Sequence, residues 1–209
     1  MSLERAIEAV VSRMRDAGVG AALAETPLRH VVQWLALMKT WNQRIDLTAA
    51  KTDDDLAELM LADALVLAAR VPFGARVVDV GSGAGAPGLA LALARPDLKV
   101  TLVEPLNKRV SFLRTVLGTT ARTDVRLERG KGEDAAARGE RWAVAISRAT
   151  LAPPEWLALG ARLVERGGSV WVLLAKEDAP ALEGARVAED VAYAAASGAP
   201  RRAVRYAID

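Results

Sequence analysis

Four glycines stand close together in the first half of the sequence, where they could expose backbone rather than side chain to a ligand. All lie within eight residues, more than a tight turn needs: Gly81, Gly83, Gly85 and Gly88. Glycine takes positive φ at little cost and lets a ligand come close to the main chain. A carboxylate, Glu104, follows 21 residues after Gly83 and could accept hydrogen bonds from ribose hydroxyls. The pattern therefore predicts a site for a nucleoside-containing cofactor.

A β-α-β unit is needed to bring these residues together. The apolar run 77–80 is typical of a buried strand, and 89–94 of an apolar helix whose first turn accepts Pro87. Residues 99–103 predict a second strand, which ends at Glu104. Ligands of open α/β sheets lie outside the carboxyl ends of the strands, so the glycines and Glu104 should share one edge. The helix N-terminus adds free N–H groups and the positive end of a dipole.

Two cofactor classes compete for this unit. The spacing Gly83-x-Gly85-x-x-Gly88, with Glu104 beyond it, fits the fingerprint of dinucleotide-binding proteins. In that fingerprint the first glycine directly follows the strand, whereas here Gly81 and Ser82 intervene. The pattern Asp79-x-Gly81-x-Gly83-x-Gly85 resembles motif I of class I methyltransferases, which bind S-adenosylmethionine (SAM). We favour SAM and keep the dinucleotide as the alternative.

Composition excludes several function classes. The chain has 209 residues, 52% of them apolar, enough for a sizeable core. Without cysteine it forms neither disulfides nor covalent thiol adducts, and with a single histidine we expect no metal. No apolar run is long enough to span a membrane, and no signal peptide is evident. We therefore expect a cytoplasmic protein and a monomer. The net charge of +2 neither favours nor excludes a nucleic-acid partner.

The remaining elements divide the chain into two parts. Residues 1–70 predict a helical extension, with helices over 3–17, from a Thr26 cap and Pro27 to about 44, and from Thr52 or Asp53 to about 70. Residues 71–209 predict a Rossmann-like methyltransferase domain. Further strands are expected at 124–128, 142–147, 169–174, 187–196 and 201–208. Strands that alternate with helices predict a doubly wound, mostly parallel sheet, and a closing hairpin makes the last strand antiparallel.

Several separated segments together resemble one family. They are WNQRIDLT (41–48), VVDVGSGAGAPG (77–88), NKRVSFL (107–113) and ISRA (146–149). In this order and spacing they are similar to the RsmG family, also called GidB, over about residues 31–176. That resemblance implies a class I SAM-dependent methyltransferase that acts on N7 of a guanine in 16S ribosomal RNA. The implied partner is 16S rRNA or the small ribosomal subunit.

The resemblance also implies which residues hold the cofactor. The loop contacts would be Gly81, Gly83, Gly85 and Ala86. Glu104 would bind the ribose, and Gly132 with Glu133 the adenine. Arg148 would lie beside the methionine end and position the reactants, without a general base, because guanine N7 carries a free lone pair and no proton. A structural ion pair is the alternative role for Arg148.

Some positions depart from the family's pattern. In the third helix, Met60 and Ala64 replace the usual His and Ser of HxLDS, while Asp63 is kept. Lys131 stands where an arginine is usual, and Glu177 where a glycine is usual. Two alternatives therefore stay open beside the rRNA enzyme. One is a diverged methyltransferase with another substrate, and the other is a nucleotide- or RNA-binding module without activity.

Overall fold

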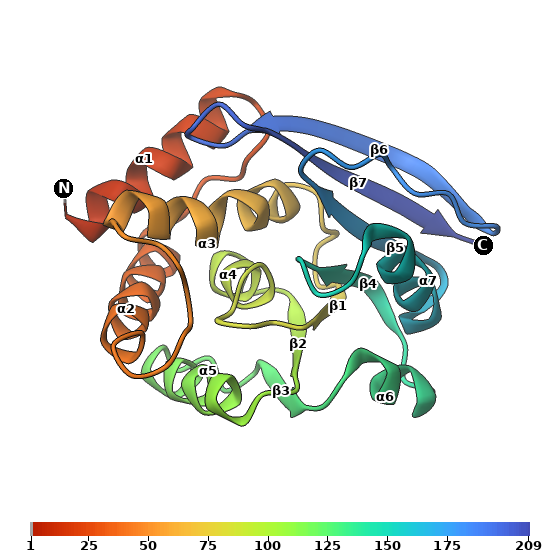
Figure 1. Ribbon diagram of the computed structural model, residues 1–209, viewed down its shortest axis with the longest axis horizontal. Helices are drawn as coiled ribbons and strands as arrows, with labels where there is room; N and C mark the ends of the chain where they lie inside the picture. Colours follow the sequence, from red (N-terminus) through yellow and green to blue (C-terminus); the bar gives the residue numbers. More distant parts are fainter. Residues whose placement is uncertain (1) are drawn as a thin grey trace.

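A seven-stranded sheet forms the centre of the computed structural model, which describes residues 2–209 (Figure 1). The strands are β1 (Arg76–Val80), β2 (Lys99–Glu104), β3 (Arg126–Arg129), β4 (Trp142–Ser147), β5 (Val164–Leu174), β6 (Ala185–Ala194) and β7 (Pro200–Ile208). The helices are α1 (Leu3–Asp16), α2 (Glu25–Trp41), α3 (Asp53–Ala68), α4 (Gly88–Ala94), α5 (Asn107–Thr119), α6 (Gly132–Ala137) and α7 (Pro153–Leu163).

The strand order is β3-β2-β1-β4-β5-β7-β6. Strand β1 lies between β2 and β4 and pairs in parallel with both, and β2–β3 and β4–β5 are parallel as well. Only β7 runs antiparallel, against β5 on one side and β6 on the other. The predicted doubly wound, mostly parallel sheet and its antiparallel closing strand are confirmed.

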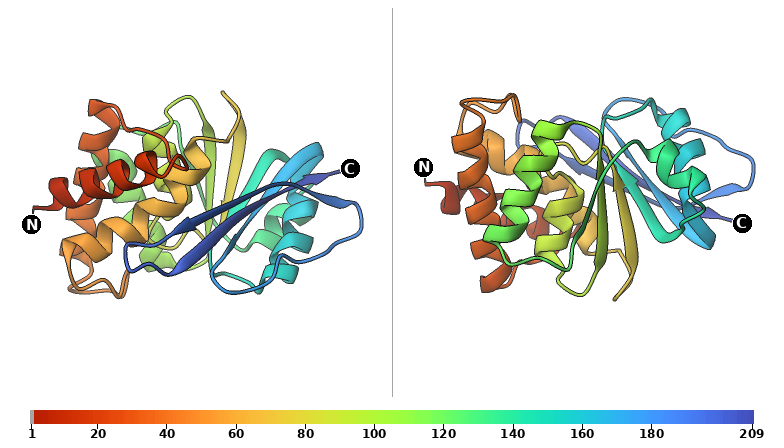
Figure 2. Two further views of the ribbon diagram at one scale, coloured as in Figure 1. Left: turned by 90° about the horizontal axis from the view of Figure 1, so that it is seen from above. Right: turned by 90° about the horizontal axis from the view of Figure 1, so that it is seen from below.

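Apolar side chains alternate between two cores, one on each face of the sheet. Val77 of β1 packs into the core beneath helices α1 to α5, whereas Val78 and Val80 pack beneath α6 and α7. Figure 2 shows the two groups of helices on opposite sides of the sheet. A parallel strand buried on both faces needs such a continuous apolar run, which is why 77–80 was recognisable as a strand.

The N-terminal helices pack on the same core as the sheet. Ile7 of α1, Trp34 of α2 and Leu65 of α3 are fully buried in one cluster with Val77 and with Leu91 of α4. Helices α1 to α3 therefore bury their apolar faces against the rest of the chain rather than against one another alone.

The β6–β7 hairpin is fastened to these N-terminal helices. Arg13 of α1 donates to the Ala194 carbonyl at 2.6 Å and pairs with Glu58 of α3 at 2.5 Å. Glu58 also accepts a hydrogen bond from the Ala196 amide at 3.1 Å. At the other end of α3, Arg70 pairs with Glu189 of β6 at 2.8 Å. Helices α1 and α3 thus lie beside the turn that joins β6 to β7, whereas the two termini lie on opposite sides of the molecule (Figure 1).

The helix caps confirm one prediction and contradict another. Thr52 caps α3 through a capping box with Asp55, as expected. Helix α2 begins at Glu25, with Ala24 at the N-cap and no side-chain cap, so the predicted Thr26 cap is wrong. Proline is tolerated throughout the first helical turn because those N–H groups have no partner within the helix, so Pro27 did not mark the first position.

Strand β5 starts earlier than the sequence predicts. The predicted strand begins at 169, after a glycine pair, Gly167 and Gly168, that suits a turn, but β5 runs from Val164. Trp142 pairs with Val164, and Val144 pairs with Ser169, so the residues between form a bulge. Gly167 takes a φ of +76° within it. Glycine pairs suit bulges as well as turns, and the sequence pattern did not separate the two.

Candidate functional site

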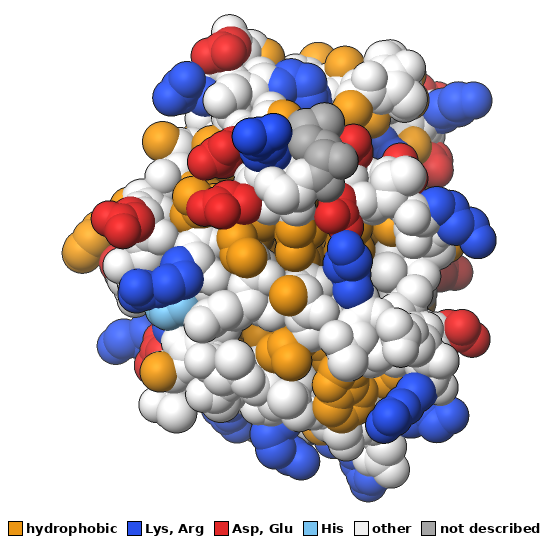
Figure 3. Space-filling view, turned by 90° about the vertical axis from the view of Figure 1, so that its left-hand side faces the viewer, with side chains coloured by type: hydrophobic (Ala, Val, Ile, Leu, Met, Phe, Trp, Pro, Cys, Tyr) orange, Lys and Arg blue, Asp and Glu red, His pale blue; other side chains and the backbone are white. Residues whose placement is uncertain are grey.

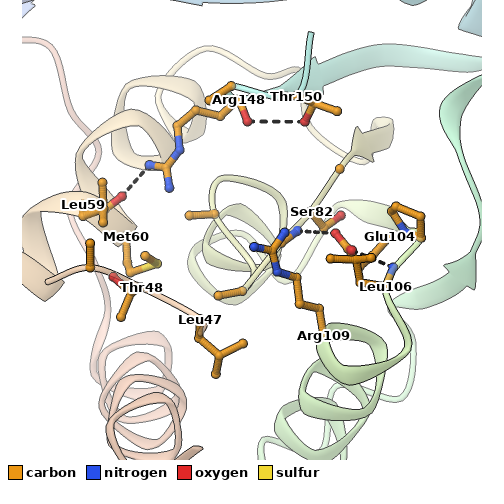
Figure 4. Close-up of a pocket in the computed structure, with 17 residues that line it drawn as sticks. Leu47, Thr48, Leu59, Met60, Ser82, Glu104, Leu106, Arg109, Arg148 and Thr150 are labelled. Atoms are coloured by element: carbon orange, nitrogen blue, oxygen red, sulfur yellow. Dashed lines mark hydrogen bonds between the residues drawn. The ribbon is translucent and has the colours of Figure 1, made fainter. Parts of the chain in front are cut away.

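A cavity of about 570 Å³ lies at the carboxyl ends of β1, β2 and β4 (Figure 4). Its wall contains five of the residues predicted from the sequence: Gly81, Gly83, Ala86, Glu104 and Arg148. A second cavity of about 230 Å³ adjoins it through shared Gly81, Pro105 and Thr150, and is lined by Gly132 and Glu133. Seven of the eight predicted residues thus line one composite cavity, and Gly85 lines neither part.

The loop glycines differ in what surrounds them. A Cβ on Gly83, where φ is +58°, would meet nothing closer than the Gly81 carbonyl oxygen at 3.8 Å. Gly83 therefore presents bare backbone to open space, as a close-binding ligand requires. A Cβ on Gly85 would instead lie 2.9 Å from Leu89 and 3.0 Å from Trp34. Packing beneath the loop explains glycine at position 85.

A buried carboxylate holds the loop against the start of α4. Asp79 is fully buried, and its Oδ2 accepts the Gly88 amide at 3.0 Å, while its Oδ1 has no partner among the described residues. Burial raises the pKa of Asp79 to about 7. A Cβ on Gly88 would lie 2.3 Å from Oδ2, so glycine is required there. The sequence pattern included Asp79 but not this role.

Glu104 connects the loops that follow β1 and β2. Its side chain is buried, its Oε2 accepts the Gly83 amide at 2.8 Å, and its Oε1 accepts the Leu106 amide at 2.8 Å (Figure 4). Each carboxylate oxygen has a further lone pair, so Glu104 can still accept a ligand hydroxyl. Binding of a ribose by Glu104 remains a prediction.

Arg148 reaches from the end of β4 to α3. Its Nη1 donates to the Leu59 carbonyl and, at 3.2 Å, to Asp63 Oδ2. Asp63 Oδ1 accepts the hydroxyl of Tyr193 on β6 at 2.5 Å. The structural ion pair considered from the sequence is therefore present, in a residue that also lines the cavity. The remaining guanidinium N–H groups leave Arg148 able to bind an anion.

Part of the cavity wall comes from the N-terminal region and was not predicted from the sequence. Leu47, Thr48, Leu59 and Met60 line the larger cavity. Asn42 shapes this segment, because its side-chain oxygen accepts the amides of Leu47 and Thr48 and its amide donates to the Thr48 carbonyl. The WNQRIDLT segment contained this signal, since asparagine readily bonds nearby backbone.

Two tryptophans of α2 are structural. Trp34 is fully buried and donates its Nε1–H to the carbonyl of Ala84 in the glycine loop at 3.0 Å. Trp41 packs edge-on against Phe112 of α5, with ring centroids 5.7 Å apart. Neither side chain lines the cavity. Helix α2 thus supports the loop from beneath.

Neither a metal-binding cluster nor a membrane-spanning helix is present in residues 2–209. No three His, Cys, Asp or Glu side chains come close enough together to hold a metal ion. No helix in the same range is long and apolar enough to cross a membrane.

Solved structures share this fold. An O-methyltransferase from Bacillus cereus, crystallised with S-adenosylhomocysteine (SAH), matches 96% of this chain and 99% of its own, with a TM-score of 0.61 and 13% identity. TrmN from Thermus thermophilus matches 74% of this chain and 48% of its own, with a TM-score of 0.53 and 20% identity. At these identities the likeness concerns the fold alone.

Sequence comparison is more specific. A protein of Anaeromyxobacter dehalogenans strain 2CP-1, named ribosomal RNA small subunit methyltransferase G, is 37% identical over 71% of this chain and 70% of its own. A protein of the same name from Acidothermus cellulolyticus is 39% identical over 80% of this chain and 73% of its own. Residues 28–200 match the family described as rRNA small subunit methyltransferase G, GidB. The chain therefore belongs to the rRNA small subunit methyltransferase G family, and the resemblance seen in its motifs is confirmed.

Proposed function

We propose that this protein transfers a methyl group from SAM to N7 of a guanine in 16S ribosomal RNA. Membership of the family makes it an rRNA methyltransferase that uses SAM, and gives no support to a dinucleotide enzyme or an inactive module. The methylated atom and the residues that hold donor and acceptor belong to the proposal.

The observation that carries the choice of N7 is the lack of a free general base. Glu104 is the only carboxylate in the wall of the larger cavity within residues 2–209, and each of its oxygens accepts a backbone amide, while Glu133 lines only the adjoining cavity, at the end proposed for the adenine. Asp63 is held by Arg148 and Tyr193, and Asp79 is fully buried. An exocyclic amine must lose a proton during methylation, whereas guanine N7 attacks through a free lone pair. Orientation alone serves this reaction.

The cavity suits the methyl donor in size and chemistry. Its volume of about 570 Å³ lies within the range of small-molecule sites. SAM supplies a methyl group that the sulfonium charge already activates. In our proposal the Gly81–Ala86 loop, Gly85 included, holds the donor through its backbone and Glu104 binds the ribose. Gly132 and Glu133 hold the adenine, and Arg148 binds the carboxylate of the methionine end.

The departure at Met60 bears on the acceptor. Met60 lies in the cavity wall, where the family usually has a histidine in this helix. A thioether offers neither a strong donor nor a strong acceptor, so this side chain contributes apolar contact. A methyltransferase with a different substrate therefore stays the second candidate function, and the methionine at position 60 is the observation that favours it.

We further propose the cellular setting of the reaction. The enzyme acts as a monomer in the cytoplasm on 16S rRNA or the small subunit, without a metal. We propose a helical extension over residues 1–70 and a methyltransferase domain over 71–209 as its two units.

The test has two steps. Titration calorimetry with SAM and, as a control, NAD examines the donor, and we expect micromolar binding of SAM alone. The protein is then incubated with SAM and 16S rRNA, free or in small subunits that lack the modification. Primer extension after chemical cleavage at 7-methylguanine should give a new stop. Methyl transfer without 7-methylguanine would support the diverged-substrate alternative, and no transfer at all would contradict the proposal.

A further inference from the structure

A third cavity, of about 490 Å³, adjoins the large one on the side of α5. The two share Leu106 and Arg109 in their walls. One side of the third cavity is the turn after α2, with Arg44 and Asp46, and the other is the first turn of α5, with Lys108. We call this cavity the basic groove. Through these two residues it borders the space where the methyl donor and acceptor would meet.

The basic groove carries an excess of positive charge that no protein carboxylate neutralises. Arg44, Lys108 and Arg109 form no ion pair within residues 2–209, unlike Arg95 and Arg122, which bind Asp97 and Asp124. Three cations stand against the one carboxylate of Asp46, a local excess of two. The net charge of the whole chain is only +2, so the excess positive charge in this groove is as large as that of the entire protein.

The positions of these side chains suit a flexible polyanion. Arg44 and Lys108 are exposed, and Arg109 is half-buried and extends from α5 toward the large cavity (Figure 4). The first turn of α5 contains no acidic residue that would compete for them. On the face shown in Figure 3, Lys and Arg side chains gather along the lower edge, the end of the molecule where Figure 1 places α5.

We propose that the basic groove binds backbone phosphates of the RNA strand next to the target nucleotide. This inference rests on the proposed function, because the groove and the large cavity share two residues and the proposed acceptor is a polyanion that would extend from one to the other. Leu106, which is 53% exposed at the junction, offers apolar surface between the phosphates and the target base. Phosphate contacts of this kind fix the register of a nucleic acid without reading its sequence.

The test compares a double variant with a matched control. Arg44→Ala with Lys108→Ala removes two of the three cations, and both residues are exposed, so the fold is kept. Arg114→Ala removes an exposed cation from the same helix, and that residue lines none of the cavities described above. The dissociation constant for 16S rRNA transcribed in vitro is measured by filter binding from 0.1 to 1 M salt, together with SAM affinity by calorimetry.

Each phosphate contact to a single strand contributes about 0.7 to the slope of log Kd against log salt. The slope for the double variant should therefore be smaller by about 1.4. Relative to 1 M salt, this corresponds to an affinity roughly 25-fold weaker than that of the wild type at 0.1 M salt. SAM affinity should not change, and the defect in methyl transfer should fall on KM for RNA. Arg114→Ala should keep the wild-type slope.

The outcomes separate this inference from the proposed function. A double variant with the wild-type slope overturns the groove, even where the wild-type enzyme methylates RNA normally. A loss of about 0.7 of slope in Arg114→Ala, the same loss per cation removed, also overturns it, because the effect is then one of total charge. Loss of slope in the double variant alone supports the groove, even if the wild-type protein forms no 7-methylguanine and the proposed function fails.

Discussion

Replacement of Asp79 by Asn should change the pH dependence of stability in a defined direction. Burial raises the pKa of Asp79 from 3.8 to about 7, so the folded protein keeps a proton that the unfolded chain has lost. Its contribution to stability is therefore greatest below pH 4 and falls as the pH rises toward 7. Three pKa units correspond to about 4 kcal/mol, or about 1.4 kcal/mol per pH unit.

Asparagine cannot ionise, so the variant lacks this pH-dependent contribution to stability. Its stability relative to the wild type should rise by about 4 kcal/mol from pH 4 to 7 and then level off. A further difference in stability, independent of pH, depends on how the asparagine side chain accepts the Gly88 N–H. In the wild-type protein this N–H donates to Asp79 Oδ2 at 3.0 Å. The prediction therefore concerns the slope with pH rather than the sign of the difference at one pH.

Urea unfolding of both proteins, without SAM, at pH 5, 6, 7 and 8.5 measures this slope. Asp97→Asn is the matched control, because hydrogen bonds from Arg95 lower the pKa of Asp97 to about 2. The stabilisation from Asp97 is present above pH 4 and is lost only as the pH falls through 2, so its variant should differ from the wild type by a constant amount. A constant difference for Asp79→Asn as well would show that Asp79 is ionised throughout and would refute the reasoning.

Three other substitutions test the site. Gly83→Val should fill the open space beside the loop and weaken SAM binding about 100-fold or more in calorimetry; unchanged affinity would mean that no ligand approaches there. Tyr193→Phe removes the hydroxyl that orients Asp63 and should lower kcat/KM for methyl transfer about five- to tenfold, whereas equal steady-state rates would limit this bond to a structural role. Trp34→Phe leaves the buried Ala84 carbonyl without its donor and should cost about 1–3 kcal/mol in urea unfolding, and a loss near zero would argue that another donor replaces it.

The sequence predicted the strands and the ligand loop because local patterns determine them. The apolar run 77–80 is long enough for a parallel strand and too short for a helix. The turn after it requires glycine at position 83, where φ is +58°. Glu104 was found by its place at the end of the next strand. Such features depend on a few neighbouring residues, and the structure brings them together as expected.

Features that depend on distant contacts were not predictable in the same way. Glycine at position 85 meets Leu89 four residues on, but also Trp34, which lies 51 residues earlier in the chain and whose approach no local pattern shows. Leu47 and Thr48 are held at the cavity by hydrogen bonds from their amides to Asn42, and nothing in the segment 41–48 showed that it would face the cofactor loop. The partner of Asp63 could not be read from its helix, because the Tyr193 hydroxyl that donates to it comes from 130 residues further along the chain.

The contact between Arg13 and the Ala194 carbonyl has a consequence for the order of events during synthesis. Residues leave the ribosome from the N-terminus, so α1 emerges while the hairpin that receives Arg13 has not yet been made. Pairing of β7 with β5 also waits for residues 200–208. A nascent chain can assemble the sheet from β1 to β5 earlier, but α1 can bind the β6–β7 hairpin only near release. Nascent chains arrested before residue 185 should therefore be cleaved by protease within α1 faster than the released protein.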